Sequence, residues 1–301
     1  MQRKKRHVTA IWLAAGLLFM GACGSQQHQV NEDKRQISVV GSSSVEPLLT
    51  GLSDRYQQLH PDVSFFIQAP GSSTGIRAAI DGTTDVGMTS RELTKEEIET
   101  GVHVLPLAKD GIVLIVNDEN SVDALSMEQV QQIFNGTITN WKQVGGADRP
   151  ILLVSRESGS GTRDAFDTLL GLMDGKRSTL AVKQAIFCDS TNSVSQNVAD
   201  KGNAIGYVSL GSLLPDVKPI RVDGVHCSEE TIQDGHYPIT RPFDLLIHKR
   251  NWENGDIPED IEGFFAYIGS QAGQDYIREK GFVPVGFQMN GHWQEEENRN
   301  G

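Results

Sequence analysis

The chain has 301 residues, of which 38% are hydrophobic and 22% are charged, and its formal net charge at pH 7 is −12. This length allows one or two domains, and the composition is typical of a soluble globular protein rather than of a disordered chain. The acidic balance argues against a protein that binds nucleic acid, which should carry a basic surface. It is compatible with a small anionic ligand, because backbone amides at the start of a helix bind anions whatever the global charge is.

The first 22 residues have the pattern of an export signal. The basic stretch Arg3-Lys4-Lys5-Arg6 precedes an apolar stretch over 11–20, which is too short for a transmembrane helix. Small residues come directly before Cys23, which resembles the cleavage site of a lipoprotein signal peptide. We therefore expect a signal peptide over 1–22 and lipidation of Cys23, with the lipid as the sole membrane attachment; the alternative is a plain secretory signal with an incidental cysteine. Either signal implies export to the periplasm or the outer face of the cell envelope.

Beyond a polar tether over 23–36, short apolar strands alternate with helical stretches, and this alternation predicts an α/β fold. The run GIVLIVN over 111–117 is almost entirely apolar, as expected of a strand that is buried on both faces. Residues 288–301 form a polar tail. In chain order, strands are expected at 37–40, 63–68, 85–88, 111–117, 151–154, 204–208 and 245–247, and helices at 47–58, 75–80, 126–134, 162–170 and 261–268.

Two cysteines remain besides Cys23, namely Cys188 and Cys227. Because an exported protein lies in an oxidising compartment, we expect a disulfide between them, the alternative being two buried free thiols. No third or fourth ligand lies at zinc-like spacing from them, so no metal site is predicted, and no sequence pattern indicates a cofactor.

Three segments share one design, a turn rich in serine and glycine between a predicted strand and a predicted helix. The first four amides of a helix have no partner within the helix, and the helix dipole is positive there, so such turns offer hydroxyl and amide donors to an anion. A single turn of this kind is more often a simple helix cap. Three of them, with Arg156 beside the third, indicate a cage for a tetrahedral oxyanion. The turns read Gly41-Ser42-Ser43-Ser44, Gly71-Ser72-Ser73-Thr74-Gly75 and Ser158-Gly159-Ser160-Gly161-Thr162-Arg163.

Other chemistries match the sequence less well. The nearest approach to a nucleotide-binding loop, over 171–177, has the wrong spacing and lacks the final hydroxyl residue. Gly159-Ser160-Gly161 does not have the Gly-x-Ser-x-Gly spacing of a serine hydrolase, and the histidines follow no recognisable pattern. We therefore predict no catalytic residues and no enzymatic activity.

Seven stretches, in this order along residues 37–286, read GSSSVEPLL, PGSSTGIRAAIDGTTDVGMTSREL, GIVLIVN, FNGTITNWKQVGG, RESGSGTRDAF, NAIGYVSLG and YPITRP. In sequence, order and spacing they resemble the phosphate-binding proteins of bacterial phosphate-specific ABC transporters. The resemblance implies a two-lobed periplasmic-binding-protein fold of type II, in which two crossing strands form the hinge and the ligand binds in the cleft. It places lobe 1 at 37–117 and 241–287 and lobe 2 at 118–240.

The resemblance also implies a function, the capture of inorganic phosphate by a monomer that delivers it to the permease and ATPase of an ABC importer. The alternatives are a binding protein for sulfate, molybdate or tungstate, an exported hydrolase, or a surface module that uses the same fold. The charged partner of the ligand would be Arg156. The matching positions at the ligand are Ser43, Ser44, Ser72, Ser73, Ser90, Arg156, Ser160, Gly161 and Thr162.

One position departs from the family pattern. The best-known members carry an aspartate after the third strand, where it accepts the proton of a protonated phosphate, whereas this chain has Ser90. A carboxylate only accepts, so its loss leaves open how the site rejects sulfate; a backbone carbonyl or Glu157 could replace it. The next residue, Arg91, is either a second cation near the site or the partner of a carboxylate such as Asp85. Trp141 is expected to be a structural anchor.

Overall fold

The computed structural model describes residues 35–174, 177–180 and 185–286. The expected signal peptide, the lipidation site at Cys23, nearly all of the tether and the polar tail lie outside these residues. Within the described ranges, no helix is long and apolar enough to cross a membrane.

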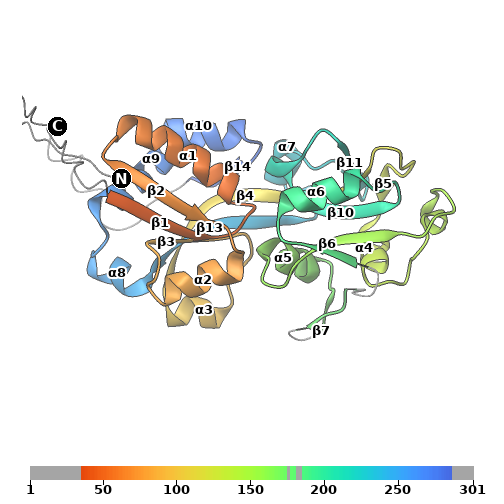
Figure 1. The fold of residues 1–301 in the computed structure, drawn as a ribbon, viewed down its shortest axis with the longest axis horizontal. Coiled ribbons are helices and arrows are strands. Elements are labelled where there is room, and N and C mark those ends of the chain that lie inside the picture. Colours follow the sequence, from red (N-terminus) through yellow and green to blue (C-terminus); the bar gives the residue numbers. More distant parts are fainter. Residues whose placement is uncertain (1–34, 175–176, 181–184, 287–301) are drawn as a thin grey trace, which may run out of the picture. The chain divides into compact units, whose positions relative to one another are not determined.

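The first half of the fold is built on five strands of a mixed sheet, namely β1 (Arg35–Gly41), β2 (Val63–Gln68), β3 (Val86–Thr89), β4 (Val102–Asn117) and β13 (Thr240–His248). β1 runs parallel to its neighbours β2 and β3, and β13 is antiparallel to β3 and β4. One face is covered by α1 (Glu46–Leu59), α9 (Glu259–Gly269) and α10 (Gln271–Glu279). The other is covered by α2 (Ser72–Ile80), α3 (Lys95–Thr100) and α8 (Lys249–Asn254) (Figure 1).

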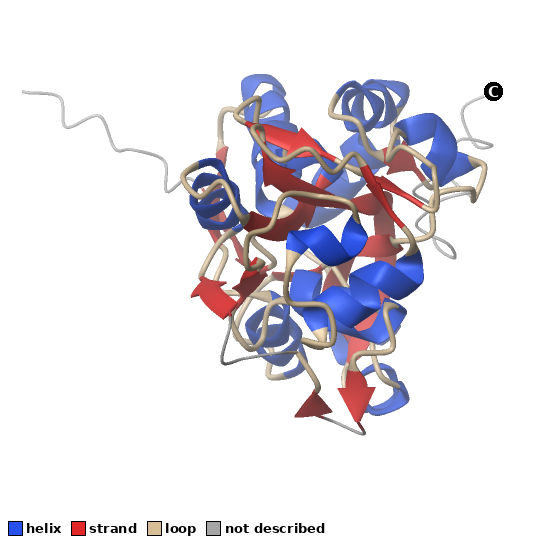
Figure 2. Ribbon diagram, turned by 90° about the vertical axis from the view of Figure 1, so that its right-hand side faces the viewer, coloured by secondary structure: helices blue, strands red, loops and turns tan. Residues whose placement is uncertain are grey.

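The second half contains three parallel strands, β10 (Ala204–Ser209), β6 (Leu152–Arg156) and β9 (Ala185–Cys188), in that order. Its helices are α4 (Met127–Phe134), α5 (Gly161–Leu169), α6 (Thr191–Ala199) and α7 (Glu229–Gln233), with single turns of 3-10 helix at η1 (Trp141–Val144) and η3 (Leu210–Ser212). Two short pairs lie outside the main sheet, β5 (Ala124–Leu125) with β12 (Arg221–Val222) and β7 (Met173–Asp174) with β8 (Arg177–Ser178). The short strands β11 (Val217–Pro219) and β14 (Val283–Pro284) pair with β4. Figure 2 shows the strands lying between layers of helices.

Two strands connect the halves. β4 pairs with β13 along residues 102–111 and with β10 along residues 112–116, so this strand belongs to both halves. Residues 112–116 are at most 1% exposed, which explains the uniformly apolar run seen in the sequence. The structure extends two predicted strands: the strand expected at 111–117 begins at Val102, and the one expected at 245–247 covers 240–248. The added residues of β4 mix exposed polar and buried apolar side chains, so they carry no continuous apolar signal.

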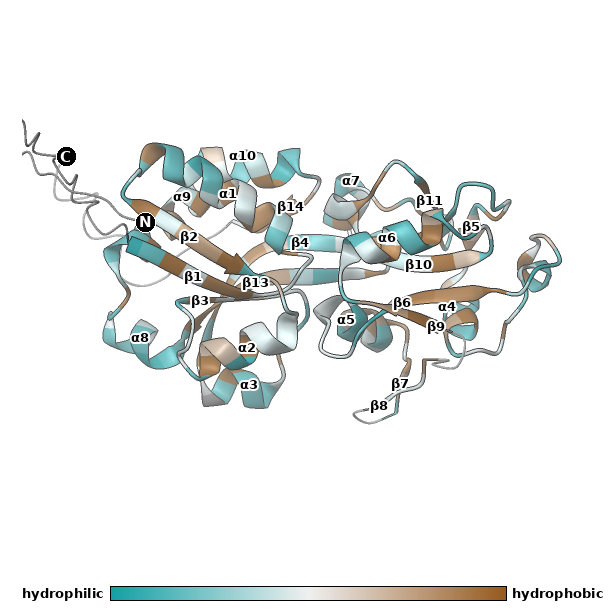
Figure 3. Cartoon of the chain, in the orientation of Figure 1, coloured by the Kyte–Doolittle hydropathy of each residue, from teal (hydrophilic) through white to brown (hydrophobic). Residues whose placement is uncertain are grey.

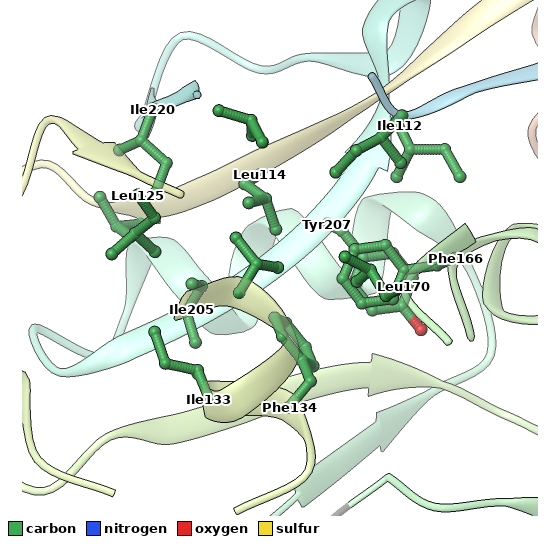
Figure 4. Close-up of a cluster of buried hydrophobic side chains, with 14 of the residues drawn as sticks. Ile112, Leu114, Leu125, Ile133, Phe134, Phe166, Leu170, Ile205, Tyr207 and Ile220 are labelled. Atoms are coloured by element: carbon green, nitrogen blue, oxygen red, sulfur yellow. The ribbon is translucent and has the colours of Figure 1, made fainter. Parts of the chain in front are cut away.

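Each half has its own apolar core, and strands within the halves, such as β1 and β6, are among the most hydrophobic parts of the chain (Figure 3). In the second half Phe166 of α5 stacks on Tyr207 of β10 at a ring-centroid distance of 3.9 Å (Figure 4). The Tyr207 hydroxyl also shares a 2.7 Å hydrogen bond with Ser155 Oγ. These contacts fix α5, and with it the third serine-glycine turn, against the sheet. Trp141 is a structural anchor as expected, since it lies in this core and its Nε1 donates to the Asn203 carbonyl over 2.9 Å.

The structure corrects the expected disulfide, because Cys188 and Cys227 are both free. Cys188 ends β9, whereas Cys227 lies against Gly111 of β4. The strand order β4-β10-β6-β9 separates these strands by three spacings, or about 14 Å, and a disulfide needs Cα atoms within about 7 Å. Burial raises the pKa of each thiol, which keeps both in the protonated and unreactive form.

A thiol count tests this assignment. The mature chain with Cys23→Ser, denatured without reductant, should present two reactive thiols to a colorimetric thiol reagent. The folded protein should react far more slowly, because Cys188 is buried and Cys227 is partly buried. If thiols were detected only after reduction, Cys188 and Cys227 would form a disulfide and the assignment of free thiols would be wrong.

Candidate functional site

The three serine-glycine turns meet at the carboxyl ends of the parallel strands. β1, β2 and β3 end at one edge of the first half, and β6 and β9 end at the facing edge of the second. The turns that follow β1, β2 and β6 lead into α1, α2 and α5, and the turn after β9 leads into α6. Ligands of open α/β sheets bind at this edge, because the helix starts and loop residues gather there.

Side chains of the two halves bond to each other directly. Ser44 Oγ shares a hydrogen bond of 2.8 Å with Thr162 Oγ1 and a longer one of 3.3 Å with Thr191 Oγ1. The amide of Ser73 donates to the carbonyl of Gly159 over 3.2 Å. Ser44 and Thr162 are at most 1% exposed, so the first and third turns form one buried site.

A row of hydroxyl groups lines the first half of this site. Ser42 Oγ donates to Ser90 Oγ over 2.8 Å, and the amide of Ser90 donates to Ser72 Oγ over 3.1 Å. Gly161 of the third turn lies so close that a Cβ there would collide with Ser72 Oγ and would lie 2.7 Å from Ser90 Oγ. A glycine is therefore required at 161 for the third turn to approach the serines.

Arg156 reaches from the end of β6 to the first turn. Its Nη2 donates to Ser43 Oγ over 3.0 Å, and its Nη1 lies 3.4 Å from Thr191 Oγ1. Nε and Nη2 also bind the two carboxylate oxygens of Glu157 at 2.9 Å each. Arg156 is 2% exposed, so it brings a buried positive charge to the site, partly compensated by its neighbour. We call this group of turns, hydroxyls and guanidinium the cage.

The sequence analysis missed a second guanidinium, that of Arg241. Arg241 and Asp110 stand opposite each other on β13 and β4, and Nε and Nη2 donate to Asp110 Oδ2 over 2.9 and 2.8 Å. Asp110 Oδ1 accepts from the Ser209 hydroxyl and the Leu210 amide, at 2.8 and 3.2 Å. Burial raises the pKa of Asp110, and Arg241 and the other donors oppose that rise.

The remaining nitrogen of Arg241 belongs to the cage. Nη1 donates to Thr162 Oγ1 over 2.7 Å and lies 3.4 Å from the Ser90 carbonyl oxygen. The only sequence signal for Arg241 was its place in the YPITRP stretch, since its carboxylate partner is far away in the chain. Thr191 gave no signal, because it follows none of the serine-glycine turns.

The helix starts at the cage differ in their capping. α1 and α2 have no capping side chain, whereas Ser160 accepts from the Arg163 amide over 3.4 Å and caps α5, and Ser190 caps α6. The first amides of α1 and α2 have backbone partners instead, since Glu46 donates to the Ser42 carbonyl, Ser73 to the Gly159 carbonyl and Thr74 to the Gly71 carbonyl. These two starts therefore contribute mainly the partial positive charge of the helix dipole. Of the predicted site residues, Ser160 is thus engaged as a helix cap through its side chain.

Arg91 lies outside the cage. Its guanidinium bonds to Glu97 at 2.9 and 3.0 Å, and its Nε is 3.3 Å from Asp164 of α5. Asp85 instead accepts from Ser38, so Arg91 pairs with carboxylates other than the one suggested. Because Arg91 follows β3 and Asp164 lies on α5, this ion pair joins the two halves, at the side of a groove of about 940 Å³.

Comparisons with known proteins agree on one family. A family profile described as the PBP superfamily domain matches residues 26–272. The chain is 29% identical over 276 residues to the phosphate-binding protein PstS of Borreliella burgdorferi, covering 89% of this chain and 97% of that protein. It is 28% identical over 300 residues to PstS of Bacillus subtilis, covering 94% and 95% respectively.

Solved structures show the same fold. One is a substrate-binding protein from Clostridium perfringens, assigned to a phosphate ABC transporter and solved with bound phosphate; it is 36% identical with a TM-score of 0.78, covering 83% of this chain and 100% of that one. Another is an ABC-type phosphate transport receptor from Vibrio cholerae, 35% identical with a TM-score of 0.70 and the same coverage. The matches extend over both halves of the fold, and the chain belongs to the PBP superfamily and, within it, to the PstS family.

Proposed function

We propose that this protein binds inorganic phosphate in the cage and delivers it to an ABC importer. The observation that carries the proposal is the meeting of buried hydroxyl groups from both halves with the guanidinium groups of Arg156 and Arg241. Guanidinium and hydroxyl donors suit the acceptor oxygens of a tetrahedral oxyanion. The PstS relatives are phosphate-binding proteins by name, and the Clostridium perfringens structure contains bound phosphate; both support phosphate as that anion.

The cage favours binding over catalysis. Within the described residues, the hydroxyl groups of the cage bond to one another, to backbone groups and to guanidinium groups, and none bonds to a histidine or carboxylate base. A serine nucleophile needs such a base for activation. The proposed chemistry is therefore capture and release of an unchanged ligand rather than its conversion.

Charge removal at Arg156 tests the cage. Arg156→Ala should weaken phosphate binding by about 2–5 kcal/mol, because a buried charge-assisted contact is lost. Isothermal titration calorimetry of the mature protein measures the effect. Arg149→Ala, which removes an equal charge from an exposed position, is the matched control and should leave the dissociation constant unchanged. If both variants bind phosphate like the parent protein, Arg156 is not part of the site.

The proton of phosphate is the basis of selectivity against sulfate, which has none at neutral pH. Asp110 accepts four donors, which fills its acceptor positions, and both oxygens of Glu157 are held by Arg156. We assign the role of acceptor to Ser90 Oγ, which accepts from Ser42 and lies 3.4 Å from Ser72 Oγ. With the Ser90 proton donated to Ser72, the second lone pair of Ser90 is open to the ligand and the hydroxyl can only accept from it.

Competition between anions tests this role of Ser90. Sulfate has no proton to donate to Ser90 Oγ, and a buried acceptor left unpaired costs about 1–3 kcal/mol. Sulfate should therefore displace labelled phosphate at least about tenfold less well than phosphate or arsenate do. Ser90→Ala should weaken phosphate binding more than sulfate binding, so the difference between the two anions in displacing labelled phosphate should become smaller. Equal displacement by the two anions from the parent protein would reopen the choice of ligand.

The same proposal places the protein outside the cytoplasm, as a monomer held by a lipid on Cys23 and docking to a permease and ATPase. Cells fed a labelled fatty acid should incorporate label into the parent protein and none into Cys23→Ser, because the thiol is the acyl acceptor. The two proteins should bind phosphate equally after purification. If the parent protein incorporates no label, Cys23 is not lipidated, and the protein would be exported without a lipid anchor.

A further inference from the structure

A second cavity lies on the first half of the fold. It has a volume of about 390 Å³ and is bounded by α3, by α8 and by residues 102–104 of β4. No residue of the cage lines it. Its size is in the range of small-molecule sites.

The cavity contains a buried carboxyl group without a partner. Asp244 of β13 lines the cavity and is only 5% exposed. In the part of the chain that the structure describes, its carboxyl group makes no hydrogen bond and no ion pair. Burial, with a smaller effect from Glu92, raises the pKa of Asp244 to about 7. Leaving such a group unpaired is costly, which is a reason to look for a ligand that pairs with it.

The walls of the cavity are aromatic and aliphatic. The rings of His103 and Trp252 stack at a centroid distance of 3.8 Å and an interplanar angle of 6°. Burial lowers the pKa of His103, so its ring is uncharged at neutral pH. Leu93, Ile98 and other aliphatic side chains complete the lining, and Ile98 is 45% exposed. These surfaces suit the hydrocarbon part of a ligand.

The charges around the cavity favour a cation. Glu92, Asp244 and Glu253 contribute three carboxyl groups, against the single ammonium group of Lys249. A metal ion fits less well, because the described residues contain no group of three His, Cys, Asp or Glu side chains able to hold one. An organic ammonium ion matches both the excess of carboxyl groups and the face of Trp252.

We propose that this cavity binds a small protonated alkylamine, whose ammonium group pairs with the Asp244 carboxylate while its hydrocarbon chain lies against Trp252 and the aliphatic wall. The site is separate from the cage, so amine binding and anion binding are independent. The ammonium group needs the ionised form of Asp244. Glu92 after β3, His103 on β4, and Lys249 and Glu253 on α8 are the other charged or titratable groups at the cavity.

Calorimetric titration of the mature protein with n-butylammonium tests the proposal. Binding should be at least about tenfold stronger at pH 8 than at pH 5.5, because the amine stays protonated throughout while Asp244 loses its proton across this range. Asp244→Asn should weaken binding at least about tenfold and remove most of this pH dependence. Asp54→Asn, an exposed position on α1 with the same change of charge, is the matched control and should bind like the parent.

Two further measurements show whether the Asp244→Asn variant is folded and whether the amine acts at Asp244. Phosphate titration of Asp244→Asn should match the parent protein, which shows that the variant is folded. Carboxyl-carbon NMR of the parent should show the pKa of Asp244 falling when n-butylammonium is added. Absence of amine binding by the parent, equal binding by the two aspartate variants, or n-butanol binding as tightly as n-butylammonium would each overturn the proposal.

Discussion

Asp110 and Arg241 face each other on the two strands that connect the halves, and the position of the cage depends on this pair. Both side chains are buried, and such charges are stable only when their hydrogen bonds are made, because desolvation is costly. Asp110 accepts four donors, which leaves Arg241 Nη1 to reach Thr162. Removing either partner would leave an uncompensated buried charge, at a cost of about 3–5 kcal/mol. The connecting strands thus supply a cation that neither half holds alone.

An acidic protein can hold an anion because the donors act at short range. The formal net charge is −12, but charges beyond about 8 Å are largely screened at physiological ionic strength. Within the cage, guanidinium and hydroxyl groups are the donors that can turn toward a ligand, and the positive ends of α1 and α2 lie beside them. A hydroxyl group whose own proton is already donated elsewhere can also accept, so it matches the protonated oxygen of phosphate. The global charge therefore affects the approach of an anion more than its binding.

Local patterns in the sequence predicted much of this site. The serine-glycine turns and Arg156 could be identified because each lies in a short segment next to a predicted strand or helix. Arg241 could not, since its role depends on Asp110 on a partner strand. The disulfide was wrong for a related reason: a count of cysteines carries no information on the strands that separate Cys188 from Cys227. Contacts that depend on strand register and sheet order, rather than on neighbours in sequence, could be identified only from the structure.

The contacts between the halves are individually weak, which has a consequence for how the cage closes. A partly exposed ion pair such as Arg91–Asp164 contributes on the order of 1 kcal/mol, and a buried hydrogen bond such as Ser44–Thr162 about 0.5–1.5 kcal/mol. The sum of a few such contributions is comparable with the free-energy cost of ordering the side chains that make the contacts. An anion bridging Arg156 and the first turn adds hydrogen bonds to charged groups, each of about 1.5–3 kcal/mol. If phosphate is the ligand, its own bonds then outweigh the direct contacts, and closure follows occupancy of the cage.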